Sequence, residues 1–207
     1  MTCWQCATEA ESALLCPHCQ ALQPPPNDYF TFFGLPRKLA IDTERLQVHF
    51  YELSRKLHPD KYSRKSERER GYSTAATAIL NDGWRTLKNP VLRAEYLLTQ
   101  EGLEMAEQRT KDVPPELLEE VFELNMALEE LRSGDDSAKK ELSLARDRFA
   151  AMMVASDAEL QRNFLRWDNE GGEGGEGGMD ALGAIRAVLN RRRYISNLIR
   201  DVEKELS

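Results

Sequence analysis

The chain has 207 residues, and its 28 Lys and Arg against 35 Asp and Glu give a formal net charge of −7. With 41% apolar and 30% charged residues, its composition is typical of a folded protein and excludes global disorder. No apolar run approaches the roughly 20 residues of a membrane-spanning helix, and the acidic balance disfavours nucleic acid as a partner. The length suffices for one large or two modest domains, and we expect neither a membrane nor nucleic acid as a partner.

The N-terminal segment lacks the features of a targeting sequence. Its first basic residue is Arg37, whereas transit peptides are rich in arginine and signal peptides open with positive charge before an apolar stretch. We therefore expect a cytoplasmic protein. Because disulfides rarely persist in a reducing cytosol, the four cysteines point to a metal site.

Residues 29–102 show helical periodicity. Apolar side chains spaced by four, three and four residues share one face of a first helix: Leu46, Phe50, Leu53 and Leu57. Asp42 is a suitable N-cap for this helix, and Pro59 predicts its end. A second helix is expected to stop before Pro90, and a shorter one follows it.

Residues 110–207 predict three more amphipathic helices. Pro114 and Pro115 suit the start of the first, and the apolar stripes of all three are best buried in a small antiparallel bundle. The Gly/Glu segment at residues 170–179 predicts a flexible loop between the last two helices. The expected fold class is all-α, since no β pattern occurs outside the cysteine segment. Its expected parts are a metal module with a Pro-rich linker (1–26), a helical hairpin domain (27–102) and a three-helix bundle (110–207).

All four cysteines lie near the N-terminus as two Cys-x-x-Cys pairs: Cys3, Cys6, Cys16 and Cys19. Each pair can hold one edge of a tetrahedron, and four thiolates saturate a zinc ion and leave no open position for a substrate. Because so short a segment cannot form a core, we expect one structural Zn²⁺ per chain that holds the module folded. A rubredoxin-like iron site and redox-active thiols are the alternatives.

The tetrapeptide His58-Pro59-Asp60-Lys61 separates the two long helices of the hairpin domain. The domain opens with Tyr29-Phe30-x2-Phe33-Gly34-Leu35 and closes with Asn81-x2-Trp84-x2-Leu87-x2-Pro90. In this context residues 27–102 resemble the J-domain of the DnaJ co-chaperones, in which His-Pro-Asp lies in a loop between two helices. The resemblance implies that the loop and the preceding helix bind an ATP-dependent heat-shock chaperone of the DnaK/HscA type and stimulate its ATP hydrolysis.

Basic side chains surround this motif. Within residues 53–65 only Asp60 opposes five cations: Arg55, Lys56, Lys61, Arg64 and Lys65. A local positive patch on an acidic protein can steer a negatively charged partner, and a solvated helix face is the alternative. We assign chaperone binding to Arg55, Lys56, His58, Pro59, Asp60 and Lys61.

The rest of the sequence indicates which kind of J-protein this chain resembles. A Gly/Phe-rich region and Cys-x-x-Cys-x-Gly-x-Gly repeats are absent from the sequence. Residues 90–98 with the helical tail are instead similar to the HscB family, the J-type co-chaperones of iron–sulfur cluster assembly. The similarity covers residues 29–207, and the cysteine module resembles an extension found in some members. It implies that the bundle binds the scaffold protein (IscU type) on which clusters are built.

The first bundle helix carries more apolar surface than one core stripe requires. A second stripe runs through Leu118, Phe122 and Met126, which predicts a docking face or, alternatively, a broad core stripe. With the resemblance, we assign scaffold binding to Leu118, Phe122, Glu123, Met126, Arg193 and Tyr194. Two positions depart from the family pattern: Glu119 stands where an apolar residue is usual, and Met126 where an acid is usual.

Three functional hypotheses follow, and the leading one is not an enzyme. The first is an adaptor between a heat-shock chaperone and the iron–sulfur scaffold protein. The second is a J-protein for a different client, and the third is a redox protein with iron in the four-cysteine site. The second apolar stripe could equally serve a homodimer.

Overall fold

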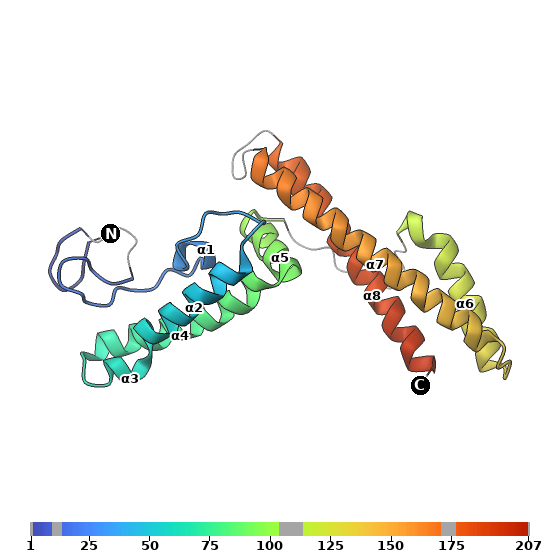
Figure 1. Cartoon of the computed structure of the whole chain (residues 1–207), viewed down its shortest axis with the longest axis horizontal. Helices are drawn as coiled ribbons and strands as arrows, with labels where there is room; N and C mark the ends of the chain where they lie inside the picture. The colour runs from blue at the N-terminus through green and yellow to red at the C-terminus, as the bar shows by residue number, and fades with distance from the viewer. Residues whose placement is uncertain (1, 10–13, 104–113, 171–176, 207) are drawn as a thin grey trace. The chain divides into compact units, whose positions relative to one another are not determined.

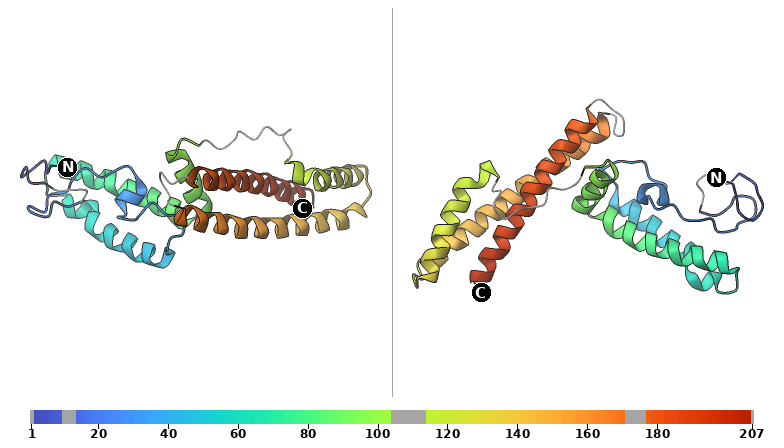
Figure 2. Two further views of the ribbon diagram at one scale, coloured as in Figure 1. Left: turned by 90° about the horizontal axis from the view of Figure 1, so that it is seen from above. Right: turned by 180° about the vertical axis from the view of Figure 1, so that it is seen from behind.

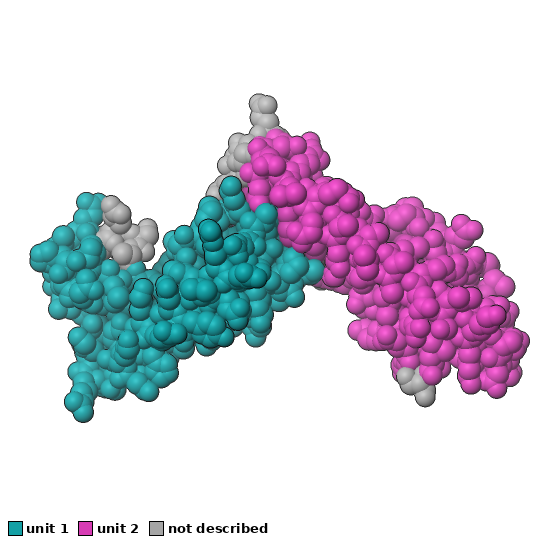
Figure 3. Space-filling view, viewed as in Figure 1, with its two compact units in different colours: residues 1–96 teal, residues 97–207 magenta. Residues whose placement is uncertain are grey.

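The computed structural model describes residues 2–9, 14–103, 114–170 and 177–206. Within these ranges all regular structure is helical, and β pairing is confined to two isolated bridges in the cysteine segment. The all-α prediction is therefore confirmed. No helix in the described ranges is both long and apolar enough to cross a bilayer. The chain divides into two compact units, residues 1–96 and 97–207 (Figure 3).

Unit 1 contains the cysteine segment and a helical hairpin. Its helices are α1 (Tyr29–Phe32), α2 (Thr43–Leu57), α3 (Pro59–Tyr62), α4 (Glu67–Lys88) and most of α5 (Pro90–Gln100). The long helices α2 and α4 run antiparallel, and the short α3 lies at the end of the hairpin where they are joined (Figures 1 and 2). The predicted helices of this segment are thus present with the expected ends.

Capping side chains set the starts of both hairpin helices. The Asp42 carboxylate accepts hydrogen bonds from the N–H groups of Glu44 and Arg45 at 3.1 and 3.0 Å. The Ser66 hydroxyl does the same for α4, accepting from the N–H of Glu69 at 3.3 Å. Each bond satisfies an N–H that the first turn of a helix leaves without a partner, which fixes where the helix begins.

Close packing of α1 on α4 depends on a glycine. A Cβ built at Gly83 would lie 2.9 Å from the ring of Phe33 and 3.1 Å from that of Tyr29. At the next residue of α4, Trp84 stacks on Phe50 of α2 with ring centroids 5.1 Å apart. Three aromatic residues of the J-domain pattern, Tyr29, Phe33 and Trp84, therefore take part in the contacts of α1 and α2 with α4, and Gly83 provides the space for α1.

Unit 2 is built from η1 (Pro115–Leu117), α6 (Leu118–Arg132), α7 (Ala138–Asn169) and α8 (Gly178–Leu206). Side chains from all of them form one buried cluster: Leu117, Leu124, Ala127, Leu142, Ala145, Phe149, Ile195 and Val202. The expected three-helix packing is therefore present. Its first helix begins as a 3₁₀ turn at Pro115, because proline at a helix start lacks the N–H that would go unpaired there.

The bundle contains three helices over only part of its length. Helices α7 and α8 have 32 and 29 residues and run antiparallel, whereas α6 has 15. Beyond α6 the pair continues as a two-helix hairpin (Figures 1 and 2). This part of α7 still buries large side chains: Leu160, Phe164 and Trp167. Of the Gly/Glu segment expected to be a flexible loop, residues 171–176 lie outside the described residues.

Candidate functional site

The four cysteine sulfurs form one compact cluster. The Sγ atoms of Cys3 and Cys19 lie 3.7 Å apart, as do those of Cys6 and Cys16, and all four lie within 4.8 Å of one another. These distances exclude disulfide bonds, and all four thiols are free. A tetrahedral zinc ion with Zn–S bonds of about 2.3 Å requires sulfurs about 3.8 Å apart. The cluster therefore has the dimensions of a four-thiolate metal site.

The two Cys-x-x-Cys knuckles have the same local fold. The N–H of Cys3 donates to the carbonyl of Thr8 at 2.9 Å, and the N–H of Ala7 donates back to the carbonyl of Cys3 at 3.0 Å. The second knuckle repeats both bonds after Cys16. The residue that follows each second cysteine, Ala7 or Gln20, has a positive φ of 60°. This left-handed turn brings the two sulfurs of a knuckle to the same side, and the sequence did not predict it because neither residue is a glycine.

The protonation of the thiols is unequal. Burial works to raise the pKa of Cys3, but hydrogen bonds from the Cys6 and Gln5 backbone and the adjoining thiols lower it to about 6. At Cys19 a backbone hydrogen bond from Ala21 lowers the pKa of the thiol. Burial and the neighbouring sulfurs raise it by more, so that the pKa is about 12. Four thiolates this close cannot all carry charge without a cation among them, and this donor set suits a metal with a preference for sulfur.

The cysteine segment packs on α4 through Trp4, which lies inside the first knuckle. Its indole N–H donates to the carbonyl of Leu22 at 2.7 Å, which ties the two ends of the module together. Its ring makes an edge contact with Tyr72, with centroids 6.4 Å apart, and lies under the guanidinium of Arg68. Sequence reasoning missed this contact, since nothing in a Cys-x-x-Cys pattern indicates which helix the module touches.

The His58–Asp60 turn differs from the expected loop. Pro59, Asp60 and Lys61 belong to the one-turn helix α3, and His58 is its N-cap. The Nδ1 atom of His58 accepts a hydrogen bond from the N–H of Asp60 at 3.3 Å and lies 3.5 Å from its carboxylate. A helical turn forms because Pro59 supplies the backbone angle of a first helical residue and has no N–H to satisfy.

Two hydrogen bonds anchor this turn to the hairpin. The Ser73 hydroxyl on α4 donates to the carbonyl of Leu57 at 2.6 Å, and the Tyr62 hydroxyl on α3 donates to the carbonyl of Lys56 at 3.3 Å. Both acceptors are carbonyls at the end of α2, which lack partners within the helix. The turn is thus held at both ends while the side chains of His58 and Asp60 stay exposed, 55% and 92% respectively.

The cations around this turn face solvent. All five side chains are exposed, and in the described part of the chain none of them lies within ion-pair distance of a carboxylate: Arg55, Lys56, Lys61, Arg64 and Lys65. An exposed set of charges without internal partners can attract an acidic surface at long range.

The second apolar stripe of α6 is exposed. The exposed fractions of Leu118, Phe122 and Met126 are 55%, 66% and 49%, whereas Leu124 and Ala127 on the same helix are buried. A broad core stripe is therefore excluded for these three side chains. Contiguous apolar side chains on a helix surface are typical of a docking face.

The other residues that the sequence assigned to scaffold binding lie in different settings. Glu123, next to Phe122 on α6, makes an ion pair with Arg148 of α7 at 2.9 Å. Arg193 is exposed on α8, and Tyr194 is half-buried and packs against the bundle core. Burial raises the pKa of Tyr194. Tyr194 therefore supports the bundle as well as contributing to its surface, while Phe122 does only the latter.

Comparison with known proteins agrees with this arrangement. The family model of the HSCB C-terminal oligomerisation domain matches residues 113–203. The iron–sulfur cluster co-chaperone protein HscB of mouse is 34% identical over 137 residues, which make up 63% of this chain and 58% of the mouse protein. The aligned part thus spans just over half the length of that relative.

Two solved structures extend the similarity over most of the chain. The crystal structure of human co-chaperone protein HscB has a TM-score of 0.71 at 26% identity and covers 99% of this chain and 98% of the human one. Chaperone HscB from Vibrio cholerae has a TM-score of 0.57 at 28% identity, over 86% and 96% of the two chains. With its helical hairpin and its matching C-terminal domain, the chain is therefore similar over most of its length to the HscB co-chaperones.

Proposed function

We propose that this protein is a J-type co-chaperone that binds an iron–sulfur cluster scaffold protein and delivers it to a DnaK/HscA-type chaperone, whose ATPase it stimulates. The observation that carries the proposal is the presence of two exposed sites on two separately packed units. The His58–Asp60 turn lies on unit 1, and the apolar stripe with Phe122 lies on unit 2. Separate cores allow each unit to hold its own partner.

The charge around the His58–Asp60 turn supports the chaperone half of the proposal. Its cations have no carboxylate partners among the described residues, so they are available to an acidic surface. The turn itself is anchored through Ser73 and Tyr62 and needs no rearrangement to present His58. The catalysis of ATP hydrolysis belongs to the chaperone, and this chain contributes binding contacts.

The exposed stripe of α6 supports the scaffold half. Phe122 lies at its centre, between Leu118 and Met126, where an aromatic side chain is suited to anchor an interface. Joining two binding units in one chain makes the meeting of chaperone and scaffold nearly intramolecular, which raises their effective concentration. This is how an adaptor with no catalytic group of its own accelerates a transfer between two proteins.

The metal of the cysteine cluster is proposed to be zinc in a structural role. The sulfur spacing suits it, and four thiolates leave no coordination position for a substrate. Four-thiolate iron has the same ligands but is coloured, whereas zinc is not. A colourless protein with about one zinc per chain, measured by elemental analysis, would support this assignment. A red protein with iron at that stoichiometry would favour the redox alternative.

The test of the proposed function is calorimetric titration of the full chain with the iron–sulfur scaffold protein of the same organism. Saturable one-to-one binding is the expected result. The chaperone's ATPase should rise when the chain is added and rise further with the scaffold present. Absence of scaffold binding, with ATPase stimulation retained, would instead indicate a J-protein for a different client.

A further inference from the structure

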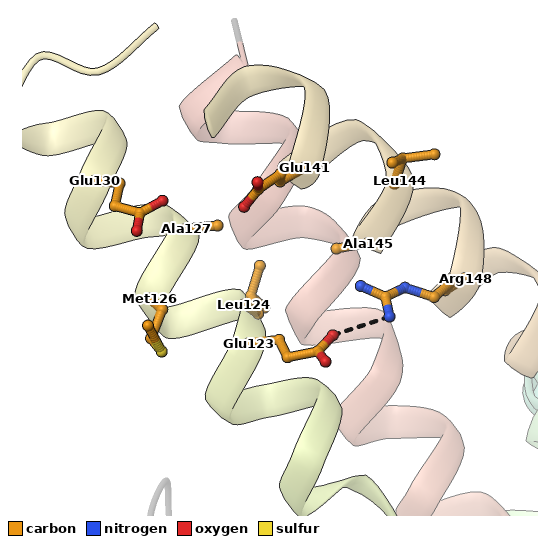
Figure 4. Close-up of a pocket in the computed structure, with 9 residues that line it drawn as sticks. All are labelled: Glu123, Leu124, Met126, Ala127, Glu130, Glu141, Leu144, Ala145 and Arg148. Atoms are coloured by element: carbon orange, nitrogen blue, oxygen red, sulfur yellow. Dashed lines mark hydrogen bonds and ion pairs between the residues drawn. The ribbon is translucent and has the colours of Figure 1, made fainter. Parts of the chain in front are cut away.

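A groove lies between α6 and α7, next to the exposed stripe of α6. Its volume is about 260 Å³, and Figure 4 shows its lining. The floor is apolar and contains Leu124 and Ala127 from α6 and Ala145 from α7. None of the residues that the sequence assigned to scaffold binding lies on α7. The groove therefore extends the surface that carries Phe122 onto α7.

The groove exists because two facing positions carry small side chains. Ala127 and Ala145 are buried at the contact of the two helices, and a methyl group at each leaves space that a leucine would fill. On the α7 rim Leu144 is 54% exposed, although it lines the groove. The floor and this rim together form an apolar slot that water occupies poorly.

The two ends of the groove differ in charge. At one end the ion pair of Glu123 and Arg148 links α6 to α7 (Figure 4). At the other end Glu130 of α6 and Glu141 of α7 line the groove together. Within the described ranges neither of these two carboxylates has a cation at ion-pair distance. One end is therefore neutralised internally, and the other is acidic and open.

We propose that this groove receives one apolar side chain of the scaffold protein, with a Lys or Arg next to it that binds between Glu130 and Glu141. The inference rests on the proposed function and extends it, because it predicts the chemistry of the scaffold segment. Two carboxylates at one end of an apolar slot are complementary to a cation beside an apolar side chain. Met126 lines the groove and belongs to the exposed stripe, so the two surfaces are continuous.

Size and charge argue against other occupants. A volume of about 260 Å³ is below the roughly 300–1,000 Å³ typical of small-molecule sites and suits one side chain. A second copy of this chain would bring the same acidic end to a symmetric contact, on a protein with a net charge of −7. A basic segment of a different protein meets neither objection.

The test is calorimetric titration of variants with the scaffold protein of the same organism. Glu130→Lys and Glu141→Lys reverse the charge at the open end, and Leu144→Ser removes the apolar rim. Glu129→Lys is the matched charge control, because it lies one residue away on α6 outside the groove, and Val154→Ser is the matched apolar control, 69% exposed on α7. Circular dichroism and thermal unfolding verify that each variant is folded.

We expect each groove variant to bind the scaffold roughly ten-fold more weakly than the wild type, and each control to bind it unchanged. The affinity of Glu130→Lys should also depend less on salt, because a charge contact is lost. If the groove variants bind the scaffold with the same affinity as the wild type and the controls, the groove proposal is wrong and the proposed function stands. A wild type that does not bind the scaffold overturns both. A dimer in sedimentation that Leu144→Ser converts to a monomer would assign the groove to a second copy instead.

Discussion

The guanidinium carbon of Arg68 lies 5.0 Å from the centre of the Trp4 indole ring. Trp4 belongs to the first cysteine knuckle and Arg68 to the first turn of α4, so this contact joins the metal module to the J-type hairpin. A cation over an indole face contributes about 0.5–1 kcal/mol at an exposed site.

We predict a coupling of about that size between these two side chains. A double-mutant cycle of Trp4→Ala with Arg68→Ala, measured by denaturant unfolding, should show it. The same cycle with Arg70→Ala serves as the control, because Arg70 is exposed on the same turn of α4 and makes no contact with the indole. Equal coupling energies in both cycles would mean that the contact between the Trp4 ring and Arg68 does not stabilise the fold.

Removal of the metal should loosen the start of α4. Without the proposed metal ion, the metal–sulfur bonds that hold the two Cys-x-x-Cys knuckles together are lost. The position of Trp4 depends on the first of these knuckles, so its contact with α4 should weaken. We expect a chelator to increase amide hydrogen exchange over residues 67–73 in the wild type. In Trp4→Ala the chelator should change this segment little, since its contact to the module is already lost. An equal response of both proteins would contradict the link through Trp4.

The sequence predicted the helices, the cysteine cluster and the exposed stripe because each depends on local spacing. Asp42 and Pro59 mark the ends of α2 wherever the helix lies, and two Cys-x-x-Cys pairs suffice for a tetrahedron. The contact of Trp4 with Arg68 and the groove beside Ala145 could not be predicted. Both depend on which surfaces meet in space, and an alanine in a helix gives no sign that its neighbour is also small.

The one-turn helix α3 is a smaller example of the same limit. His-Pro-Asp indicated an interruption between two helices, and the interruption is present. Pro59 favours the first helical residue, and the N–H of Asp60 donates to the His58 ring, a side-chain to backbone bond that a pattern of residue types does not specify.

His58→Gln should abolish stimulation of the chaperone's ATPase and leave scaffold binding unchanged. The imidazole is exposed and makes its bond within the turn, so the change in unfolding free energy should stay within about 1 kcal/mol, the usual cost of a lost cap. His18→Gln is the matched control, because His18 is exposed in the cysteine segment and is not among the residues of the four-sulfur cluster. Loss of both activities in His58→Gln would show that the two units do not act independently.

Phe122→Ala should weaken scaffold binding at least ten-fold, with little effect on stability. Its side chain is exposed, and surface substitutions usually change the free energy of unfolding by less than about 0.5 kcal/mol. Phe149→Ala, in the core of the same bundle, should instead cost about 3–5 kcal/mol. Tyr194→Ala is a less clear test than Phe122→Ala because Tyr194 packs against that core. Unchanged affinity of folded Phe122→Ala would contradict the proposed scaffold face.

Asp28 should make unit 1 sensitive to acid. Burial works to raise its pKa, but hydrogen bonds from Thr31 and Tyr96, with the charge of Arg37 at 3.7 Å, hold the pKa below its ordinary value of 3.8. The ionised carboxylate is thus favoured in the fold. It contributes stability that is fully present above the ordinary pKa and is lost as the pH falls through the lower pKa of the folded state.

We therefore expect Asp28→Asn to be less stable than the wild type at pH 7 and to approach it as the pH falls below about 4. Thermal unfolding between pH 7 and pH 3 measures this difference. Asp82→Asn is the control, since Asp82 is an exposed carboxylate on α4 that makes an ion pair with Arg85 on the same helix. Loss of the proposed zinc ion in acid should affect all three proteins alike, so only the difference between them reports on Asp28. Parallel stability profiles for Asp28→Asn and the wild type would show that the negative charge of Asp28, which accepts a hydrogen bond from Tyr96 of α5, does not stabilise the unit.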